Sequence, residues 1–599
     1  MTSWLSALNP INYFPDYHGP YDVGTVDVEV PAADLPAASD TPEGAQPTIS
    51  FRIFYPCVRP GKDEEERPVR WVPQPQRIHI ASVIKYVGIS ERVAGTLSYL
   101  LRQLYWIKFP AYRNAKLLNP PTSSKRWPVT FFGHGLAGSR NAYSQICGDL
   151  ASNGMVVVAL DHRDGSSPIQ YVRETANTPA HIVYPTRIPH SPLTDEVHEA
   201  RDAQLRIRIW EICMAYEALM KIDEGYDIQN LDSNTSRTPN ERTEVLWQFN
   251  GMLDIHQPGR VIWAGHSFGA ATMVQLLKSI FYHQRRTSHD GRPLIVPNRD
   301  AAVVQQVSPE SPALLLDMWC TPLKSPQQRF LRDRPLPSYA VDGPNGANVL
   351  SVLSESFHNW EDNLNVNKAI VAKPTLSRRP SASAPVTREK GLLPRSSADE
   401  VSPEDSAERT PGPHMFYVET SQHFNQSDYG IVFPWLAQKF TKAEEPERCL
   451  ALNTRAMVQV LRESGVEVGG EDDRDILMKE EGVVRRWCPI PIEKDEEEVS
   501  RKPSALGSVD RRLSTPSGTS ISTFPPGAND TPAEQEMEAQ LSRSPRLERR
   551  ATLRSPEIQA QMKRDTEEAE MSPTGTLTMG QKTDAQLQRM GSLELPGPA

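Results

Sequence analysis

Gly265-His266-Ser267-Phe268-Gly269 is the stretch that decides the fold of this 599-residue chain. It follows an apolar segment, residues 261–264, that is typical of a buried strand, and it precedes residues 270–277, which are typical of a helix. A G-x-S-x-G pattern between a strand and a helix predicts a nucleophile elbow, a sharp turn that lifts a serine hydroxyl above a sheet edge. A glycine-rich turn without any chemistry is the alternative interpretation.

Apolar strands and amphipathic helices alternate on both sides of this elbow. Continuous apolar runs such as 155–160 are typical of strands that are buried on both faces of a parallel sheet. The sequence therefore predicts an α/β protein with the α/β-hydrolase fold, a mostly parallel, doubly wound sheet flanked by helices. The expected strands lie at 23–30, 51–55, 129–132, 155–160, 313–316 and 415–418, and the expected helices at 90–107, 143–153, 196–222 and 270–277.

The rest of the composition indicates one folded unit with polar additions. Proline is abundant, with 53 residues, and aromatic residues make up only 7% of the chain. We expect an N-terminal extension over 1–18, one hydrolase domain over 19–465 and a polar C-terminal tail over 466–599. A stretch rich in proline, serine and arginine, about 373–413, is expected to be a disordered insertion, and the tail is expected to be disordered as well.

Charge and cysteine usage exclude several classes of function. The net charge of −10 is spread over the whole length and offers no basic surface for nucleic acid. The six cysteines form no C-x-x-C pair, so we expect isolated thiols in a reducing, cytoplasmic setting and neither a disulfide framework nor a zinc site. We find no secretory signal, no apolar run of about 18 residues that could span a membrane, and no motif that calls for a metal or cofactor.

A nucleophilic serine needs a base, and the base needs a carboxylate that orients it. In this fold the three follow one another in the order serine, acid, histidine. Asp317 ends the expected strand 313–316, and His423 follows the expected strand 415–418, so both fit. A turn aspartate and a surface histidine are the alternatives.

Three other histidines fit the role of base less well. We expect the side chain of His266 to point away from the catalytic face. His162 precedes the serine and breaks the order, and His358 comes before the last expected strand.

Two backbone N–H groups are needed to stabilise the oxyanion that forms during acyl transfer. One is expected from Phe268, which follows the nucleophile, and the other from Leu136, in the glycine turn after the strand 129–132.

Several motifs beyond the elbow make the chain similar to one family, the platelet-activating factor acetylhydrolases. The segment Leu316-Asp317-Met318-Trp319 and the strand end Asp161-His162-Arg163-Asp164 are the most specific of them, whereas the elbow is generic to α/β-hydrolases. The resemblance covers roughly residues 19–465. The other matching segments are Gly19–Gly24, Phe54–Pro56, Phe132–Leu136, Asp149–Gly154 and Ser421–Asn425 with Asp428.

The resemblance implies a calcium-independent phospholipase A2 type of enzyme that hydrolyses the sn-2 ester of phospholipids carrying acetyl or short, often oxidised, acyl chains. By matching positions it makes Ser267 the nucleophile, Asp317 the orienting acid and His423 the base, with oxyanion donors at Leu136 and Phe268. This chain has Gly269-Ala270 where the family carries two glycines, and its tail has no counterpart, so its substrate preference stays open. A general carboxylesterase on soluble esters and an inactive hydrolase-fold scaffold are the alternatives.

The expected helix 90–107 is a candidate for contact with a lipid surface. Leu100, Leu101, Tyr105 and Trp106 give it a broad apolar and aromatic face, with basic residues alongside. A core or lid helix is the alternative. Phospholipid is thus the expected substrate and a membrane surface the expected peripheral partner, whereas the sequence gives no indication of an oligomeric state. Arginine pairs before Ser381, Ser514 and Thr552 are typical of kinase sites.

Overall fold

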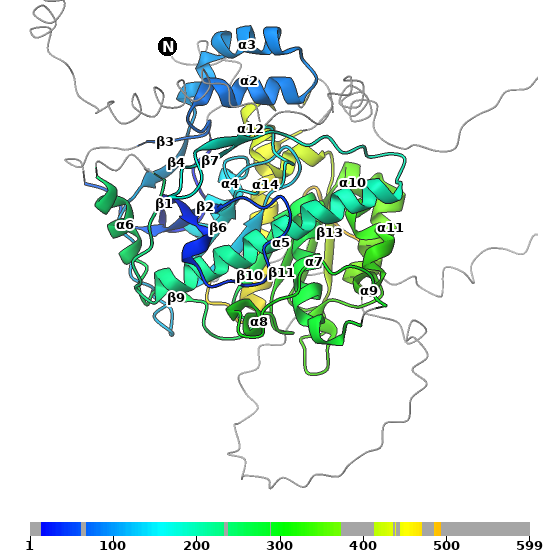
Figure 1. The fold of residues 1–599 in the computed structure, drawn as a ribbon. Coiled ribbons are helices and arrows are strands. Elements are labelled where there is room, and N and C mark those ends of the chain that lie inside the picture. The colour runs from blue at the N-terminus through cyan, green and yellow to red at the C-terminus, as the bar shows by residue number, and fades with distance from the viewer. Residues whose placement is uncertain are drawn as a thin grey trace, which may run out of the picture.

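One large mixed sheet with helices on both faces organises the computed structural model (Figure 1). The structure describes residues 14–61, 68–232, 238–287, 289–372, 412–434, 438, 444–469 and 484–492. The strands lie in the order β14-β13-β12-β11-β10-β5-β6-β2-β1-β4-β3, and β9 pairs with β5 beside this path. The six neighbouring strands from β13 to β6 are all parallel. This confirms the predicted α/β-hydrolase fold.

The strands at either end of the parallel core run in mixed directions. β2 pairs antiparallel with β6, and β14 pairs antiparallel with β13. The strand bounds are β1 Asp22–Pro31, β2 Thr48–Cys57, β3 Pro68–Arg70, β4 Lys108–Arg113, β5 Trp127–Gly133, β6 Val156–Leu160, β9 Leu253–Asp254, β10 Ile262–His266, β11 Ala313–Leu316, β12 Val349–Ser354, β13 His414–Val418 and β14 Trp487–Pro489, with a separate antiparallel pair of β7 Gln170–Val172 and β8 His181–Val183.

The helices divide between the two faces because each strand of the core directs alternate apolar side chains to opposite sides. α5, α6, α7 and α8 pack on one face, and α4, α12 and α14 pack on the other. The α-helices are α2 Gln76–Tyr86, α3 Glu91–Leu100, α4 Ser144–Ser152, α5 Asp195–Asp223, α6 Pro239–Trp247, α7 Phe268–Phe281, α8 Ala302–Gln306, α9 Arg329–Arg332, α10 Glu355–Asn359, α11 Glu361–Val371, α12 Asp428–Val432 and α14 Pro446–Glu463. The named 3-10 helices are η1 Ala32–Asp34, η2 Arg102–Trp106, η3 His283–Arg285, η4 Thr321–Lys324, η5 Pro326–Gln328, η6 Pro337–Tyr339 and η8 His423–Gln426.

The prediction of one continuous helix over 90–107 is wrong in one respect. α3 ends at Leu100, and a separate 3-10 helix, η2, continues the chain. The break lets Leu104 and Ile107 turn into the core, where they are 4% and 2% exposed. α2, which the sequence did not predict, pairs with α3, and the two project together from the body of the fold (Figure 1).

The expected end of the domain at residue 465 is placed too early. β14 adds a strand to the sheet beyond that point, and Trp487 stacks on Phe416 of β13 with ring centroids 4.8 Å apart. This burial anchors a short apolar segment in an otherwise polar stretch. Residues 1–13, most of the expected insertion, the remainder of the tail and the three expected phosphorylation sites lie outside the described residues. All six cysteines are unpaired thiols, as predicted.

Candidate active site

Ser267 occupies a sharp turn between β10 and α7. Its backbone φ is 57°, which is rare for a residue with a side chain and marks a strained position. The turn is closed because the Ser267 N–H donates to the Leu316 carbonyl at 2.9 Å. Gly269 is required here, since a Cβ on it would lie 2.0 Å from the carbonyl oxygen of Gly133. The serine is therefore held at the carboxyl edge of the parallel strands, where a nucleophile elbow is expected.

Asp317 and His423 meet at this same edge. Asp317 follows β11 and is fully buried, and His423 lies in η8, after β13. His423 Nδ1 and Asp317 Oδ2 are 2.9 Å apart, a distance at which the ring N–H donates to the carboxylate. Donation from Nδ1 leaves Nε2 as the basic nitrogen of a neutral ring.

Aromatic rings enclose His423 on two sides. Phe357 of α10 stacks on it with centroids 4.3 Å apart and planes 5° apart, and His266 lies 4.4 Å away at 32°. The expectation that His266 points away from this site is therefore wrong. Side chains alternate along a strand, but the positive φ of Ser267 ends that alternation at the turn, so His266 stays beside the base.

The other two histidines are not brought into this cluster. His162 is buried and its Nδ1 lies 2.8 Å from Glu211 of α5. His358 stacks on Tyr417 at 4.0 Å.

His266 is buried beside the base and contacts the hydroxyl of Tyr143. The Gly135 N–H donates to the Tyr143 hydroxyl at 3.1 Å, and this hydroxyl lies 2.8 Å from His266 Nδ1. Burial lowers the pKa of His266 well below its usual range, and the neighbouring His423 lowers it further. The ring beside His423 is consequently neutral, with Nδ1 as an acceptor.

The backbone groups next to Leu136 in its turn already have hydrogen-bond partners. The His134 carbonyl accepts from Arg208 at 2.7 Å, and the Gly135 carbonyl accepts from Gly138 at 3.2 Å. The Ala137 N–H donates to the Ser166 carbonyl at 3.0 Å. Within the described chain, the N–H groups of Leu136 and Phe268 donate to no other residue. Two free N–H donors beside a buried serine form an arrangement that can bind an oxyanion.

Asp428 connects the base-bearing segment to the same turn. Its carboxylate accepts from the N–H groups of Ser144 at 2.7 Å and Gln145 at 3.0 Å, at the start of α4, and from Trp71 Nε1 at 3.2 Å. Burial raises the pKa of Asp428 to about 7, although these hydrogen bonds oppose the rise. The next residue, Tyr429, donates its hydroxyl to the Ala137 carbonyl at 3.2 Å.

Four supporting residues of this site were not predicted from the sequence: Tyr143, Ser354, Phe357 and Arg208. Tyr143 and Arg208 lie on predicted elements, but no local motif distinguishes them from packing residues. Ser354 ends β12, a strand with two serines that was not predicted.

A metal at this site would compete with the hydrogen bonds already present. His266, Asp317 and His423 each offer a ligand atom, all within 4.8 Å of one another. Asp317, however, accepts from the Ser354 N–H and hydroxyl as well as from His423. Its oxygens thus fit an acid–base pair better than a metal site.

The predicted lipid-contact residues divide into two classes. Leu100 and Trp106 are 70% and 65% exposed, as is Tyr99 at 57%, whereas Leu101 and Tyr105 are half-buried against the core. In the described residues, no helix is long and apolar enough to cross a membrane.

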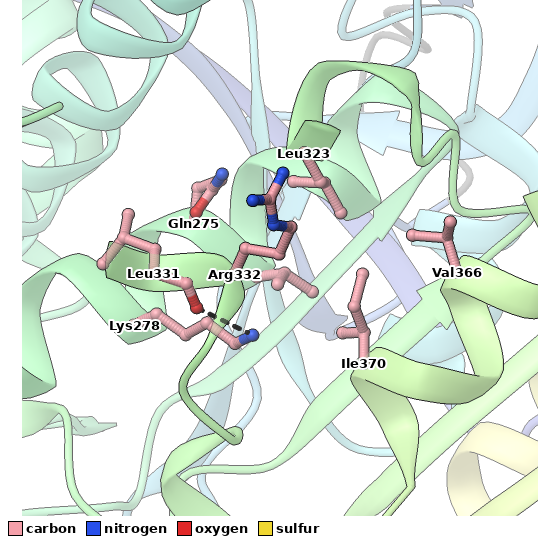
Figure 2. Close-up of a pocket in the computed structure, with 8 residues that line it drawn as sticks. Gln275, Lys278, Leu323, Leu331, Arg332, Val366 and Ile370 are labelled. Atoms are coloured by element: carbon pink, nitrogen blue, oxygen red, sulfur yellow. Dashed lines mark hydrogen bonds between the residues drawn. The ribbon is translucent and has the colours of Figure 1, made fainter. Parts of the chain in front are cut away.

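A separate small pocket lies away from this site, between α7, α9 and α11 (Figure 2). Its walls are apolar except for Gln275, Lys278 and Arg332. Lys278 is 2% exposed, and its Nζ donates to the Leu331 carbonyl at 3.3 Å. Burial lowers the pKa of this lysine to about 8.

The chain is similar to known proteins over most of its length. Residues 7–481 match the family "Platelet-activating factor acetylhydrolase, isoform II". A "Putative phospholipase A2" of Schizosaccharomyces pombe is 28% identical over 486 residues, which cover 77% of this chain and 95% of that protein. The "Platelet-activating factor acetylhydrolase" of Cavia porcellus is 31% identical over 268 residues, which cover 44% of this chain and 52% of that protein.

Among solved structures, a ferulic acid esterase from Streptomyces cinnamoneus aligns at 15% identity with a TM-score of 0.34, covering 74% of this chain and 88% of that one. Esterase B from Lactobacillus rhamnosis aligns at 11% identity with a TM-score of 0.23, covering 60% and 75%.

Proposed function

Because the chain belongs to the platelet-activating factor acetylhydrolase isoform II family, we propose that it hydrolyses the sn-2 ester of phospholipids with acetyl or short, often oxidised, acyl chains. Family membership and fold together make it a phospholipid or ester hydrolase. The observation that carries the proposed mechanism is the 2.9 Å contact between His423 and Asp317 at the edge where Ser267 turns. Such a contact supplies a neutral, oriented base next to a hydroxyl nucleophile.

In the proposed reaction, Ser267 Oγ attacks the carbonyl carbon of the sn-2 ester while His423 Nε2 takes the hydroxyl proton. Asp317 holds the ring and stabilises the imidazolium. The carbonyl oxygen becomes an oxyanion, which the N–H groups of Leu136 and Phe268 bind. Collapse of this intermediate breaks the ester bond, and His423 protonates the departing lysophospholipid oxygen.

The second half of the reaction removes the acyl group from Ser267. His423 takes a proton from water, and the resulting nucleophile attacks the acyl carbonyl carbon. The same two N–H donors bind the second oxyanion, and loss of one such donor raises the barrier by about 3–4 kcal/mol. The serine then regains its proton from His423 and the short carboxylic acid leaves.

The projecting α2–α3 pair, together with η2 that follows α3, is the proposed contact with a phospholipid surface. Leu100 and Trp106 offer exposed apolar area, and the Arg70 guanidinium lies 4.7 Å from the Trp106 ring centroid. An aromatic ring beside a cation suits the boundary between headgroups and acyl chains.

Removing Leu100 and Trp106 tests this contact. We expect Leu100→Ser with Trp106→Ser to weaken binding to phosphatidylcholine vesicles at least 5-fold, at unchanged activity on a soluble ester. Val341→Ser with Tyr226→Ser removes similarly exposed apolar residues elsewhere and serves as the control. Equal vesicle binding by the two double variants would remove the docking proposal.

Two alternatives remain distinct from the main proposal. A general carboxylesterase would prefer monomeric soluble esters to phospholipid dispersions. An inactive scaffold would hydrolyse neither. The intact set Ser267, Asp317 and His423 favours an active enzyme over the scaffold.

Labelling by a fluorophosphonate probe tests the nucleophile directly. We expect the wild type to be labelled, Ser267→Ala to lose labelling, and Ser279→Ala, a change at a buried serine inside α7, to keep it. Hydrolysis of phosphatidylcholines that differ only in sn-2 chain length then tests the substrate class. Labelling that persists in Ser267→Ala, or equal rates on acetyl and long-chain substrates, would contradict the proposal.

A further inference from the structure

The side chain of Arg208, in the middle of α5, is fully buried, and each of its three guanidinium nitrogens donates a hydrogen bond. Its Nε donates to Asp164 Oδ2 at 2.6 Å, and its Nη2 donates to Ser166 Oγ at 2.6 Å. Its Nη1 donates to the His134 carbonyl at 2.7 Å, within the turn that carries Leu136. A planar guanidinium that makes three hydrogen bonds is fixed in position and orientation.

The same guanidinium also contacts the second proposed oxyanion donor. Its central carbon lies 4.3 Å from the centroid of the Phe268 ring, within the range of a cation–π contact. Trp319, in the acid segment, packs against another side of that ring at 5.7 Å. Arg208 therefore touches the residue on each side of the proposed oxyanion hole: the turn before Leu136 and the side chain of Phe268.

Asp164 and Ser166 close a ring of contacts around the turn. Asp164 Oδ1 accepts from the Ser166 N–H at 3.2 Å and from its hydroxyl at 2.6 Å. Ser166 in turn accepts the Ala137 N–H on its carbonyl, at 3.0 Å. Burial alone would raise the pKa of Asp164, but the Arg208 charge and the Ser166 hydrogen bond lower it, so the Asp164 carboxyl is ionised at neutral pH. The peptides on either side of the one that carries the Leu136 N–H are thus held, one by Arg208 directly and the other by Ser166, whose hydroxyl bonds to both members of the buried ion pair.

We propose that Arg208, paired with Asp164, is a positioning residue that sets the geometry of the oxyanion hole through the His134 carbonyl and the Phe268 ring. The inference rests on the proposed function, because it needs Leu136 and Phe268 as oxyanion donors. It also gives the Asp161–Asp164 strand end a role that the catalytic residues alone do not explain. Arg208 does not touch the reacting atoms; it acts through the backbone of the turn and the ring of Phe268.

Arg208→Lys is the direct test, because lysine keeps the charge but carries its donors on one flexible nitrogen, without the planar fork that reaches all three acceptors. We expect kcat to fall about 30- to 100-fold with KM changed by less than 3-fold, since a displaced donor weakens only the transition state. A trifluoromethyl ketone phospholipid analogue, which forms a tetrahedral oxyanion on the serine, should lose affinity by a similar factor. A non-hydrolysable ether analogue should bind as in the wild type.

Arg52→Lys is the matched control. Arg52 is 3% exposed and pairs with Asp27 through Nε and Nη2, at 2.6 and 2.9 Å, on β2. It should lose thermal stability comparably but keep near-normal kcat. If Arg208→Lys does not fold, Asp164→Asn replaces it in the same comparison, with the same expected loss of kcat and ketone affinity.

The outcomes separate this inference from the proposed function. A wild type that neither hydrolyses esters nor binds the ketone overturns the function, and the inference with it. An active wild type in which Arg208→Lys or Asp164→Asn loses no more kcat and ketone affinity than Arg52→Lys overturns the inference alone.

Discussion

Ser354 binds both carboxylate oxygens of Asp317. Its backbone N–H donates to Oδ1 at 2.6 Å and its hydroxyl donates to Oδ2 at 2.7 Å. The oxygen Oδ2 is the one that also accepts from His423. Ser354, at the end of β12, therefore fixes the carboxylate that orients the base. Any rotation of Asp317 breaks two short hydrogen bonds.

Ser354→Ala should lower kcat about 10-fold. The substitution removes one hydrogen bond to a buried charged group, worth about 1.5–3 kcal/mol, while the backbone N–H still holds Oδ1. Steady-state kinetics on a short-chain ester measures the effect. Ser351→Ala on the same strand is the control, because Ser351 is also buried but its hydroxyl meets Asn367 at 3.2 Å. Equal kcat in both variants would mean that Ser354 has no part in orienting Asp317.

Gly135→Ala should yield a folded protein with at least 100-fold lower kcat. A Cβ at Gly135 would lie 2.9 Å from Ser267 Cβ and 3.1 Å from the Tyr143 hydroxyl, so the turn or the serine must move. Small displacements of this kind are costly for catalysis because attack needs precise orientation.

Gly95→Ala provides the control for this glycine. It lies in α3, where an added Cβ meets nothing within 4 Å, so we expect unchanged kcat and stabilisation by about 0.5–1 kcal/mol. Circular dichroism and thermal melting check that both variants fold. Normal activity in Gly135→Ala would show that the turn does not adjoin the working nucleophile.

From the sequence we could predict those parts of this site that follow a local pattern of residues. The elbow has its glycines, and Asp317 ends a run of four apolar residues, so the position of each follows from strand periodicity and chain order. Contacts between distant segments leave no such pattern. Arg208 sits among apolar residues of α5, and nothing in its neighbourhood indicates that its partner is the His134 carbonyl, 74 residues away.

The strand β14 and the early end of α3 escaped prediction for the same reason, because contacts between distant segments decide both. β14 is three residues long and is stabilised by pairing with β13, so tertiary contact and not local composition decides its structure. α3 ends early because Leu104 and Ile107 gain more from burial than from continuing an exposed helix.

Tyr143→Phe should reduce kcat about 10-fold and the free energy of unfolding by about 1–3 kcal/mol. The change leaves the Gly135 N–H and His266 Nδ1 buried without a partner. It also frees the His266 ring next to the base. Tyr55→Phe is the control, since its buried hydroxyl donates to the Ala115 carbonyl at 2.7 Å, on β2 and away from the turn. Chemical denaturation and kinetics should show a stability loss in both variants but a loss of kcat only in Tyr143→Phe.

Lys278→Met should stabilise the protein at neutral pH. A fall of the lysine pKa from its ordinary 10.5 to about 8 means that folding disfavours the charged form by about 3 kcal/mol. Because the folded pKa is depressed, the penalty is absent above pH 10.5, grows as pH falls, and is complete below pH 8. Methionine fits the apolar walls shown in Figure 2 and loses only the hydrogen bond to the Leu331 carbonyl, worth about 1 kcal/mol.

Urea denaturation at pH 7 and pH 10 measures the difference between Lys278→Met and the wild type. We expect the variant to be more stable by about 1–3 kcal/mol at pH 7, and most of this gain to vanish by pH 10, where the folded lysine is neutral and the unfolded lysine is close to its ordinary pKa of 10.5. Lys221→Met, a half-exposed change on α5, should alter stability little at either pH. If Lys278→Met is less stable than the wild type at pH 7, the charged form of Lys278 must be stabilised in the folded protein by more than its one hydrogen bond to a carbonyl. A gain in stability that is the same at pH 7 and pH 10 would show that it comes from packing and not from removal of the charge.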